Sequence, residues 1–214
     1  MPHLILASQS PRRQQFLRDL GLGFVIMAAD IDETPRPGET PMALARRLAE
    51  EKARAVAGSL PADAPPALII AADTVVAVGD RVLGKPADAA DATAMLARLR
   101  GRPHRVHSGA SVLSTADGRQ STRVNSTRVT MRAYTDAEIA AYVASGDPLD
   151  KAGAYAIQHP AFAPVARLEG CLSGVMGLPL GDLRDLLATF GVEIDRPLAP
   201  VCEQYSDRFG CCLR

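Results

Sequence analysis

The spacing of apolar and polar residues along the chain predicts an alternation of strands and helices. Short apolar runs bounded by turn-forming residues are typical of strands, whereas apolar residues that recur every three or four positions are typical of helices. The predicted strands span residues 3–7, 24–27, 67–73, 75–78, 81–83, 106–113 and 123–131. The predicted helices span residues 12–20, 40–57, 88–99, 135–145 and 180–190. This pattern indicates the α/β class, with a mixed twisted β-sheet flanked by helices.

Local signals mark several of these boundaries. Ser10-Pro11 and Thr40-Pro41 each place a capping residue before a proline, which fits the first turn of a helix. Gly79-Asp80 predicts a two-residue hairpin turn between two short strands. Residues 29–39 have no period and contain several turn-forming residues, so we expect a loop there.

The pattern indicates one structural unit followed by an extension. The length of 214 residues suits a single domain, and no Pro/Gly-rich joint or internal repeat divides the chain. We expect one domain over residues 1–191. Residues 192–214 show no period, which predicts a loosely held C-terminal extension without an assigned role.

The charge balance narrows the class of partner. The chain has 24 basic and 24 acidic side chains, so no net charge attracts a nucleic-acid backbone. With no Trp, four Tyr and five Phe, it also offers few aromatic platforms on which bases could stack. We therefore expect a small-molecule ligand and no polymeric nucleic acid.

The hydrophobic pattern indicates neither a membrane span nor a secretory leader. The apolar runs stay below the roughly 18 residues that a transmembrane helix needs, and the first residues lack the parts of a signal peptide. Cys171, Cys202, Cys211 and Cys212 do not have the spacing of a zinc site, so we expect free thiols. The expected location is the cytoplasm, with no membrane partner.

The segment Ser8-Gln9-Ser10-Pro11-Arg12-Arg13 is the first candidate for a functional site. A strand runs directly into a helix here, so free backbone N–H groups and the positive end of the helix dipole meet two guanidinium groups. This arrangement favours an anion pocket. A capped helix with solvated arginines is the alternative, because arginines in a first turn oppose the dipole.

Later polar residues form a second group of candidates. Asp73 is expected to end a buried strand, where mixed sheets open toward ligands, and Lys85 follows a hairpin in a tight turn. Both also fit ordinary turn chemistry. Lys52 belongs to an amphipathic helix, and the charged face of such a helix is more often simply solvated. Residues 150–158 lead from a charged pair to an amide, which fits a polar site or a β-turn.

No common catalytic signature accompanies these residues. The four histidines lack ligand spacing, and the chain has no nucleophile elbow, P-loop or dinucleotide fingerprint. Lysines and arginines at turns are instead combined with carboxylates that include Glu33, Asp73 and Asp150. This mixture suits a polyphosphate substrate, a divalent metal and an activated water.

The order of these segments resembles the Maf family of nucleoside triphosphate pyrophosphatases, formerly described as septum-formation inhibitors. The resemblance covers about residues 3 to 190. It is carried by Ser8-x-Ser-Pro-Arg-Arg13, Asp32-Glu33-Thr34, Glu51-Lys52-Ala53, Ala72-Asp73-Thr74, Gly84-Lys85-Pro86, Asp150-Lys151-Ala152-Gly153-x-Tyr155-x-Ile157-Gln158 and Gly177-Leu178-Pro179-Leu180.

The resemblance implies a fold of two lobes around a nucleotide-binding cleft. It implies hydrolysis of a nucleoside triphosphate to the monophosphate and pyrophosphate, by water attacking the α-phosphorus with Mg²⁺ or Mn²⁺. Asp73 would accept the proton of that water and, with Glu33, hold the metal. The positions matched to substrate binding are Ser8, Arg12, Arg13, Lys52, Thr74, Lys85 and Gln158. A homodimer is also suggested by the family.

Arg12, Thr74 and Gln158 resemble the branch of the family that acts on dTTP, UTP and related modified nucleotides. A neutral amide both donates and accepts, which suits a pyrimidine edge with two carbonyls. Residues 159–164 depart from the glycine-rich stretch common in the family, which leaves the substrate range open. Two alternatives also remain: a nucleotide-sensing regulator of cell division or septum formation, and the same reaction on purine or methylated guanine triphosphates.

Overall fold

The structure is a computed structural model and describes residues 3–206 and 208–211. Its strands are β1 (His3–Leu6), β2 (Val25–Ile26), β3 (Ala67–Val78), β4 (Arg81–Leu83), β5 (Pro103–Ser114), β6 (Gln120–Met131) and β7 (Val165–Glu169). Its helices are α1 (Pro11–Asp19), α2 (Pro41–Ser59), α3 (Ala89–Leu99), α4 (Asp136–Ala144), α5 (Leu172–Val175), α6 (Leu180–Ala188) and α7 (Leu198–Glu203). Two short 3-10 helices, η1 (Asp147–Asp150) and η2 (Ala152–Ala154), precede β7.

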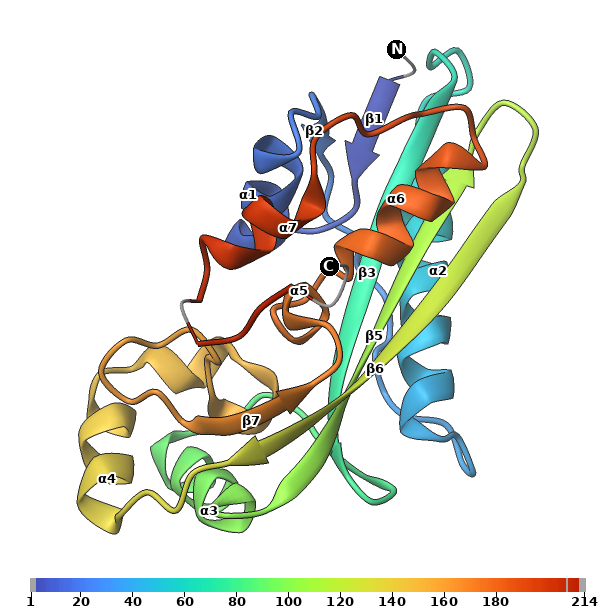
Figure 1. Cartoon of the computed structure of the whole chain (residues 1–214). Helices are drawn as coiled ribbons and strands as arrows, with labels where there is room; N and C mark the ends of the chain where they lie inside the picture. The colour runs from blue at the N-terminus through green and yellow to red at the C-terminus, as the bar shows by residue number, and fades with distance from the viewer. Residues whose placement is uncertain (1–2, 207, 212–214) are drawn as a thin grey trace.

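The strands form one mixed sheet in the order β2-β1-β3-β5-β6-β7, with β4 paired to β3 outside this path. β1 is parallel to both of its neighbours, and the other pairs are antiparallel. In Figure 1, α2 covers one face of the long twisted strands, and α5 and α6 cover the other. The expected mixed sheet flanked by helices is confirmed.

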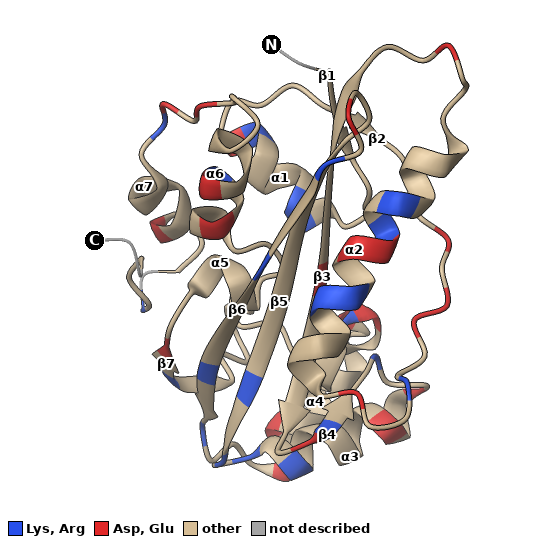
Figure 2. Cartoon of the chain, turned by 90° about the vertical axis from the view of Figure 1, so that its right-hand side faces the viewer, with Lys and Arg blue, Asp and Glu red and all other residues tan. Residues whose placement is uncertain are grey.

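The close approach of α2 to the sheet depends on a glycine. Leu44, Leu48 and Val56 are buried on its inner side, as the helical period predicts, and each contributes roughly 1.5–3 kcal/mol of burial energy. A Cβ atom at Gly109 of β5 would lie 2.3 Å from the carbonyl oxygen of Ala45. Gly109 therefore sets the distance between α2 and the sheet. Figure 2 shows charged residues of both signs along this helix.

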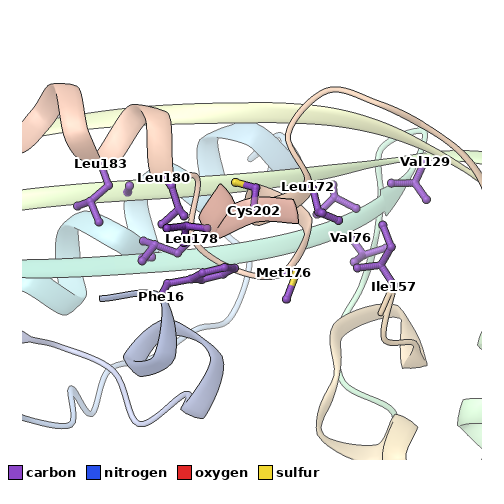
Figure 3. Close-up of a cluster of buried hydrophobic side chains, with 14 of the residues drawn as sticks. Phe16, Val76, Val129, Ile157, Leu172, Met176, Leu178, Leu180, Leu183 and Cys202 are labelled. Atoms are coloured by element: carbon purple, nitrogen blue, oxygen red, sulfur yellow. The ribbon is translucent and has the colours of Figure 1, made fainter. Parts of the chain in front are cut away.

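The larger hydrophobic core lies on the opposite face of the sheet and contains residues from both the N-terminal and the C-terminal parts of the described chain. Figure 3 shows Phe16 of α1 close to Leu178 and Leu180, with Cys202 of α7 beside them. All four side chains are almost completely buried. This core holds α1 in place through segments that come more than 150 residues later in the chain.

The prediction that Asp73 ends a strand is wrong. β3 runs without a break from Ala67 to Val78, because β5 pairs with it along the whole stretch. Asp73 lies opposite Gly109 in this ladder, so it is an internal residue of a long strand. The predicted two-residue turn at Gly79-Asp80 is confirmed by the pairing of β3 with β4.

Five short elements are absent from the predictions: β7, α5, α7, η1 and η2. Most residues of β7 are exposed or half-buried, so β7 lacks the apolar run of a buried strand. α5 and α7 are too short to show a helical period. The capping predictions had mixed outcomes: Thr40 accepts from the backbone N–H of Ala43 at 3.2 Å, whereas the side chain of Ser10 makes no capping bond.

The expectation of a loosely held extension is wrong for its described part. Arg196 donates to the carbonyl of Asp19 at 2.8 Å, and Gln204 donates to the Asp19 carboxylate at 2.8 Å. Tyr205 packs edge-on against Phe16, with ring centroids 5.0 Å apart. The extension is therefore fastened to α1. The domain boundary at residue 191 stays a prediction.

The two described cysteines of the extension are buried. Cys202 and Cys211 are free thiols, as expected. Burial raises the pKa of Cys202 to about 12, with the Cys211 thiol adding to the shift. Cys212 lies outside the described residues. No helix within the described ranges has both the length and the apolar character required to cross a bilayer.

Candidate active site

A gap in the pairing of β3 opens the sheet to a cleft. β1 pairs with the start of β3 as far as Ile70, and β4 pairs with its end from Val76 onward. Within the described strands, residues 71–75 thus pair with β5 alone. The carboxyl end of the parallel strand β1 faces this gap, which is where open sheets commonly bind ligands. The cleft has a volume of about 1120 Å³.

This cleft contains every residue predicted for the site from the sequence. They are Ser8, Arg12, Arg13, Glu33, Lys52, Asp73, Thr74, Lys85 and Gln158. They come from α1 and the segment before it, the loop before α2, α2 itself, β3, the turn after β4 and the segment after η2. Segments that are far apart in the sequence therefore meet at one opening.

Asp73 is held by a lysine from the neighbouring helix. Lys52 Nζ lies 2.6 Å from Asp73 Oδ1 and 2.6 Å from Glu33 Oε1. The side chains of Asp73 and Lys52 are 10% and 11% exposed, so water screens their attraction weakly. Glu33 is 58% exposed. The second oxygen of each carboxylate makes no hydrogen bond or ion pair with the described residues.

The loop that carries Glu33 is fastened by Arg47, which belongs to none of the sequence motifs. Arg47 donates to the carbonyl of Thr34 at 3.0 Å and forms ion pairs with Glu39 at 2.7 Å and Glu51 at 2.8 Å. Hydrogen bonding to this guanidinium lowers the pKa of Glu39 to about 2. In the sequence, Arg47 looks like part of a solvated helix face. The return of the loop onto α2 adds Glu39 and the Thr34 carbonyl to the Glu51 partner that α2 itself supplies.

Arg13 is fixed at the first turn of α1. Its Nε donates to the carbonyl of Gly177 at 2.9 Å, and its Nη1 donates to Ser8 Oγ at 3.1 Å. Gly177 has a φ of +117°, a conformation that favours glycine. Burial lowers the pKa of Arg13, and the Asp73 carboxylate opposes this shift. A guanidinium so poorly hydrated gains strongly from an anionic partner.

Ser8 faces the cleft as a hydrogen-bond donor. Its Oγ accepts from Arg13 Nη1 at 3.1 Å and from the backbone N–H of Ser10 at 3.2 Å. A serine hydroxyl has two lone pairs and one proton. Since both lone pairs are used, the O–H group is left to donate. A phosphate oxygen is a suitable acceptor for it.

The remaining lysine and arginine side chains of the cleft differ in whether they already form ion pairs within the protein. Arg12 and Lys85 line the cleft and form no ion pair with any residue that the structure describes. Lys151 also lines the cleft, but its ammonium lies 3.0 Å from the Asp147 carboxylate and 2.6 Å from that of Asp150. Arg12 and Lys85 are therefore the more available partners for a polyanion.

Gln158 lines the cleft and has a buried acceptor that is not used. Its Oε1 is buried without a hydrogen-bond partner in the described part of the chain. A buried polar atom without a partner costs roughly 1–3 kcal/mol, which a ligand donor would recover. Tyr155, also in the cleft wall, bonds to Nε2 of His104 at 2.7 Å. Burial lowers the pKa of His104 to about 4, so this histidine is neutral at neutral pH.

Asp73 and Thr74 project from opposite faces of β3, because neighbouring residues alternate along a strand. Asp73 meets Lys52 of α2, whereas Thr74 Oγ1 lies 2.9 Å from Ser108 Oγ of β5. Both side chains nevertheless line the same cleft, since this part of β3 is unpaired on one edge. The gap thus gives one ligand access to both faces of the strand.

The carboxylates fit a divalent cation only as part of a larger ligand set. Among the residues described, no three His, Cys, Asp or Glu side chains are grouped to hold a metal. Asp73 and Glu33 each keep one oxygen that is not bound to Lys52. Mg²⁺ typically takes one or two protein carboxylates and completes its shell with phosphates and water. The two carboxylates fit Mg²⁺ or Mn²⁺ on those terms.

The cleft suits a polyanion, because basic side chains line it next to a buried carboxylate held by lysine. Comparison with known families narrows the class of protein. The chain belongs to the Maf-like proteins, whose family model matches residues 3–190. The matched range includes the whole cleft, and the extension that packs on α1 follows it.

Similar proteins carry a consistent description. A protein of Pelotomaculum thermopropionicum described as dTTP/UTP pyrophosphatase is 47% identical over 91% of this chain and 100% of its own length. One of Myxococcus xanthus with the same description is 49% identical over 89% of this chain and 94% of its own. A crystal structure of a nucleoside-triphosphatase, dITP/XTP pyrophosphatase, from Mycobacterium abscessus matches with a TM-score of 0.36 and 16% identity, over 62% of this chain and 75% of that one.

Proposed function

We propose that this protein hydrolyses nucleoside triphosphates, dTTP and UTP in particular, to the nucleoside monophosphate and pyrophosphate. The observation that carries the proposal is the buried Asp73, held by Lys52 in a cleft lined with basic side chains. The relatives described as dTTP/UTP pyrophosphatases support the substrate. They match this chain over almost their whole length, and the matched range includes the cleft.

The triphosphate binds to the hydrogen-bond donors and cations that line the cleft. Arg13 and Ser8 act from the start of α1, where free backbone N–H groups add a positive potential. Arg12 and Lys85, which have no ion pair in the described structure, complete the set. Phosphoryl transfer depends on positioning and charge neutralisation more than on covalent chemistry, so these contacts supply much of the rate.

A divalent cation is part of this proposal. Asp73 and Glu33 would hold Mg²⁺ or Mn²⁺ through the oxygens that Lys52 leaves free. The bound cation would neutralise the charge that develops on the phosphate oxygens. Because Asp73 and Glu33 offer one free oxygen each, and the other described carboxylates of the cleft, Asp147 and Asp150, are paired with Lys151, we expect the cation to bind tightly only when a nucleotide is present. Calorimetry of Mg²⁺ binding with and without dTTP measures this difference directly.

Asp73 is the proposed general base. Lys52 holds Oδ1 and thereby orients the carboxylate. Oδ2 has two lone pairs, so one would face the cation while the other accepts a proton from a water molecule. The water oxygen bonds to the α-phosphorus while the bond to the bridging α–β oxygen breaks. Pyrophosphate then leaves with that oxygen, and the monophosphate keeps the oxygen of the water.

Gln158 is the proposed reader of the base. Its unpartnered Oε1 accepts from the N3–H of thymine or uracil, and its amide nitrogen donates to a neighbouring carbonyl of the same ring. Cytosine has no N–H at N3, so it cannot form this pair. The proposal therefore includes a preference for bases with an imide group.

Product analysis is the direct test. Purified protein with Mg²⁺ is expected to release pyrophosphate and dTMP from dTTP, and to stop when the metal is chelated. Reaction in ¹⁸O-labelled water is expected to place the label in dTMP. Orthophosphate as the first product, or label in pyrophosphate, would contradict attack at the α-phosphorus. We also expect a homodimer, as the family resemblance suggests, and light scattering measures the oligomeric state separately.

A further inference from the structure

Ser108 is a fully buried polar residue behind the cleft. It lies on β5 directly opposite Thr74 of β3, so the two side chains share one face of the sheet. Ser108 is 0% exposed and does not line the cleft, whereas Thr74 does. Any effect of Ser108 on a ligand must therefore pass through another residue.

The hydrogen bonds of Ser108 have a fixed direction. Its Oγ lies 2.6 Å from the carbonyl oxygen of Gly174, and a carbonyl only accepts, so Ser108 donates its single proton there. Thr74 Oγ1 lies 2.9 Å from the same Ser108 Oγ. Since Ser108 has no second proton, Thr74 is the donor in this contact.

Thr74 consequently faces the cleft with lone pairs alone. Its one proton is committed to Ser108, and a threonine hydroxyl has no other. Ser8 has the opposite character, because both its lone pairs are used and its proton is left. The two hydroxyls therefore suit different ligand groups. Ser8 can donate to a phosphate oxygen, and Thr74 can accept from a group that carries a proton.

We propose that Ser108 is a positioning residue that fixes the Thr74 hydroxyl as an acceptor for an N–H or O–H donor of the bound nucleoside. The proposal rests on the proposed function, since it requires a nucleoside triphosphate in this cleft. Thymidine carries two such donors: the 3′-hydroxyl of the sugar, and the N3–H of the base, which Thr74 would have to share with Gln158. An unesterified phosphate oxygen, which is negatively charged at neutral pH, is excluded as the partner of Thr74.

A double-mutant cycle tests whether Ser108 acts through Thr74. Ser108→Ala frees the Thr74 hydroxyl to rotate, so kcat/KM for dTTP is expected to fall about tenfold, the usual effect of one hydrogen bond. In a Thr74→Val background no hydroxyl is left to orient, and the same change is expected to have less than about a twofold effect. Equal losses in both backgrounds would overturn the proposal.

Two substrate analogues identify the donor. 3-Methyl-dTTP lacks the N3–H, and 2′,3′-dideoxy-TTP lacks the 3′-hydroxyl. If the N3–H is the donor to Thr74, the effect of Ser108→Ala is expected to vanish for 3-methyl-dTTP and to persist for 2′,3′-dideoxy-TTP. If the 3′-hydroxyl is the donor, the opposite is expected. An undiminished loss for both analogues would contradict the acceptor role of Thr74.

A second serine of β5 provides the matched control. Ser111 is also 0% exposed, but its hydroxyl contacts the carbonyl of Ser121 and has no contact with Thr74. Ser111→Ala is expected to leave the ranking of dTTP and the two analogues unchanged. Ser108→Thr keeps the hydroxyl and is expected to keep the wild-type ranking, which covers the case in which Ser108→Ala does not fold. A changed ranking in either variant would count against the proposal.

Binding measurements separate this proposal from the proposed function. The Kd for dTTP is measured by calorimetry in an Asp73→Asn background, in which dTTP is expected to bind without being hydrolysed during the titration. Ser108→Ala is expected to raise Kd about tenfold there, and by less than about twofold when Thr74→Val is also present. Wild-type protein that released no pyrophosphate from dTTP would refute the proposed function, whereas the binding cycle would still decide the role of Ser108.

Discussion

The two faces of β3 carry different chemistry although their key residues are adjacent in the sequence. On one face, Asp73 is paired with the ammonium of Lys52 and lies near the carboxylate of Glu33. On the other face, Thr74 bonds to the neutral hydroxyl of Ser108, in a region that also contains the neutral His104. The charged face suits proton transfer and metal binding. The neutral face suits recognition of an uncharged nucleoside.

This difference shows how one cleft separates reaction from recognition. The two residues are separated by a single peptide bond, yet their side chains have no partner in common. Each is held by a different neighbour: α2 supports Asp73, and β5 with α5 supports Thr74. A change on one face is therefore expected to alter the rate, and a change on the other to alter the choice of substrate.

The largest expected effect comes from Asp73→Asn. The amide keeps the shape of the side chain but cannot accept the proton of the water, so kcat is expected to fall by about 10²–10⁴-fold. The order of preference among dTTP, UTP and dCTP, measured as relative Kd values, is expected to stay the same. Full activity in this variant would contradict the role of Asp73 as the general base.

Gly109→Ala tests the support of the charged face. The new methyl group would meet the backbone of Ala45 at 2.3 Å, so α2 must move away from the sheet. We expect a loss of about 1–3 kcal/mol in the free energy of unfolding, together with a lower kcat as Lys52 is displaced from Asp73. Gly58→Ala on α2 is the control, because a methyl group there meets nothing within 4 Å. Unchanged stability of the Gly109 variant would show that α2 is not held so closely.

The pH dependence of stability tests whether His104 is buried and neutral on the neutral face. Its folded pKa of about 4 lies below the ordinary value of 6.5 because the ring is buried, so the unfolded chain binds more protons between these values. Its contribution to stability is complete above pH 6.5 and is lost as the pH falls toward 4, by about 3 kcal/mol in total. His104→Gln is expected to lose correspondingly less stability over this window, measured by denaturant unfolding. An identical pH dependence in both proteins would refute this account.

Gln158→Glu is expected to have the smallest effect on rate and a clear effect on substrate choice. A carboxylate accepts but does not donate, so it loses the bond to a pyrimidine carbonyl and suits the paired N–H donors of guanine. We expect kcat/KM for dTTP to fall about tenfold while that for GTP rises relative to it. Gln14→Glu adds the same charge outside the cleft and is expected to leave the ranking unchanged. An unaltered ranking in the Gln158 variant would contradict its role as reader of the base.

The sequence by itself determined most elements and the membership of the site. Helical period and caps placed α2 and α4, and seven ordered motifs marked the residues that the structure brings into one cleft. Such signals are local, because they depend on periodicity and on backbone preferences that each segment carries with it. The same local signals placed Asp73 wrongly, since the end of an apolar run does not show whether a partner strand continues.

Only the tertiary structure decided which groups support the site and with what polarity. Arg47 and Ser108 belong to no sequence motif, and their contacts with Thr34 and Thr74 exist only in the folded chain. The extension after Val192 lacked a period because α7 is a short helix held by contacts with α1. The direction of a hydrogen bond, the unpaired stretch of β3 and the fit of Gly109 against α2 depend on neighbours distant in the sequence, so no local pattern contains them.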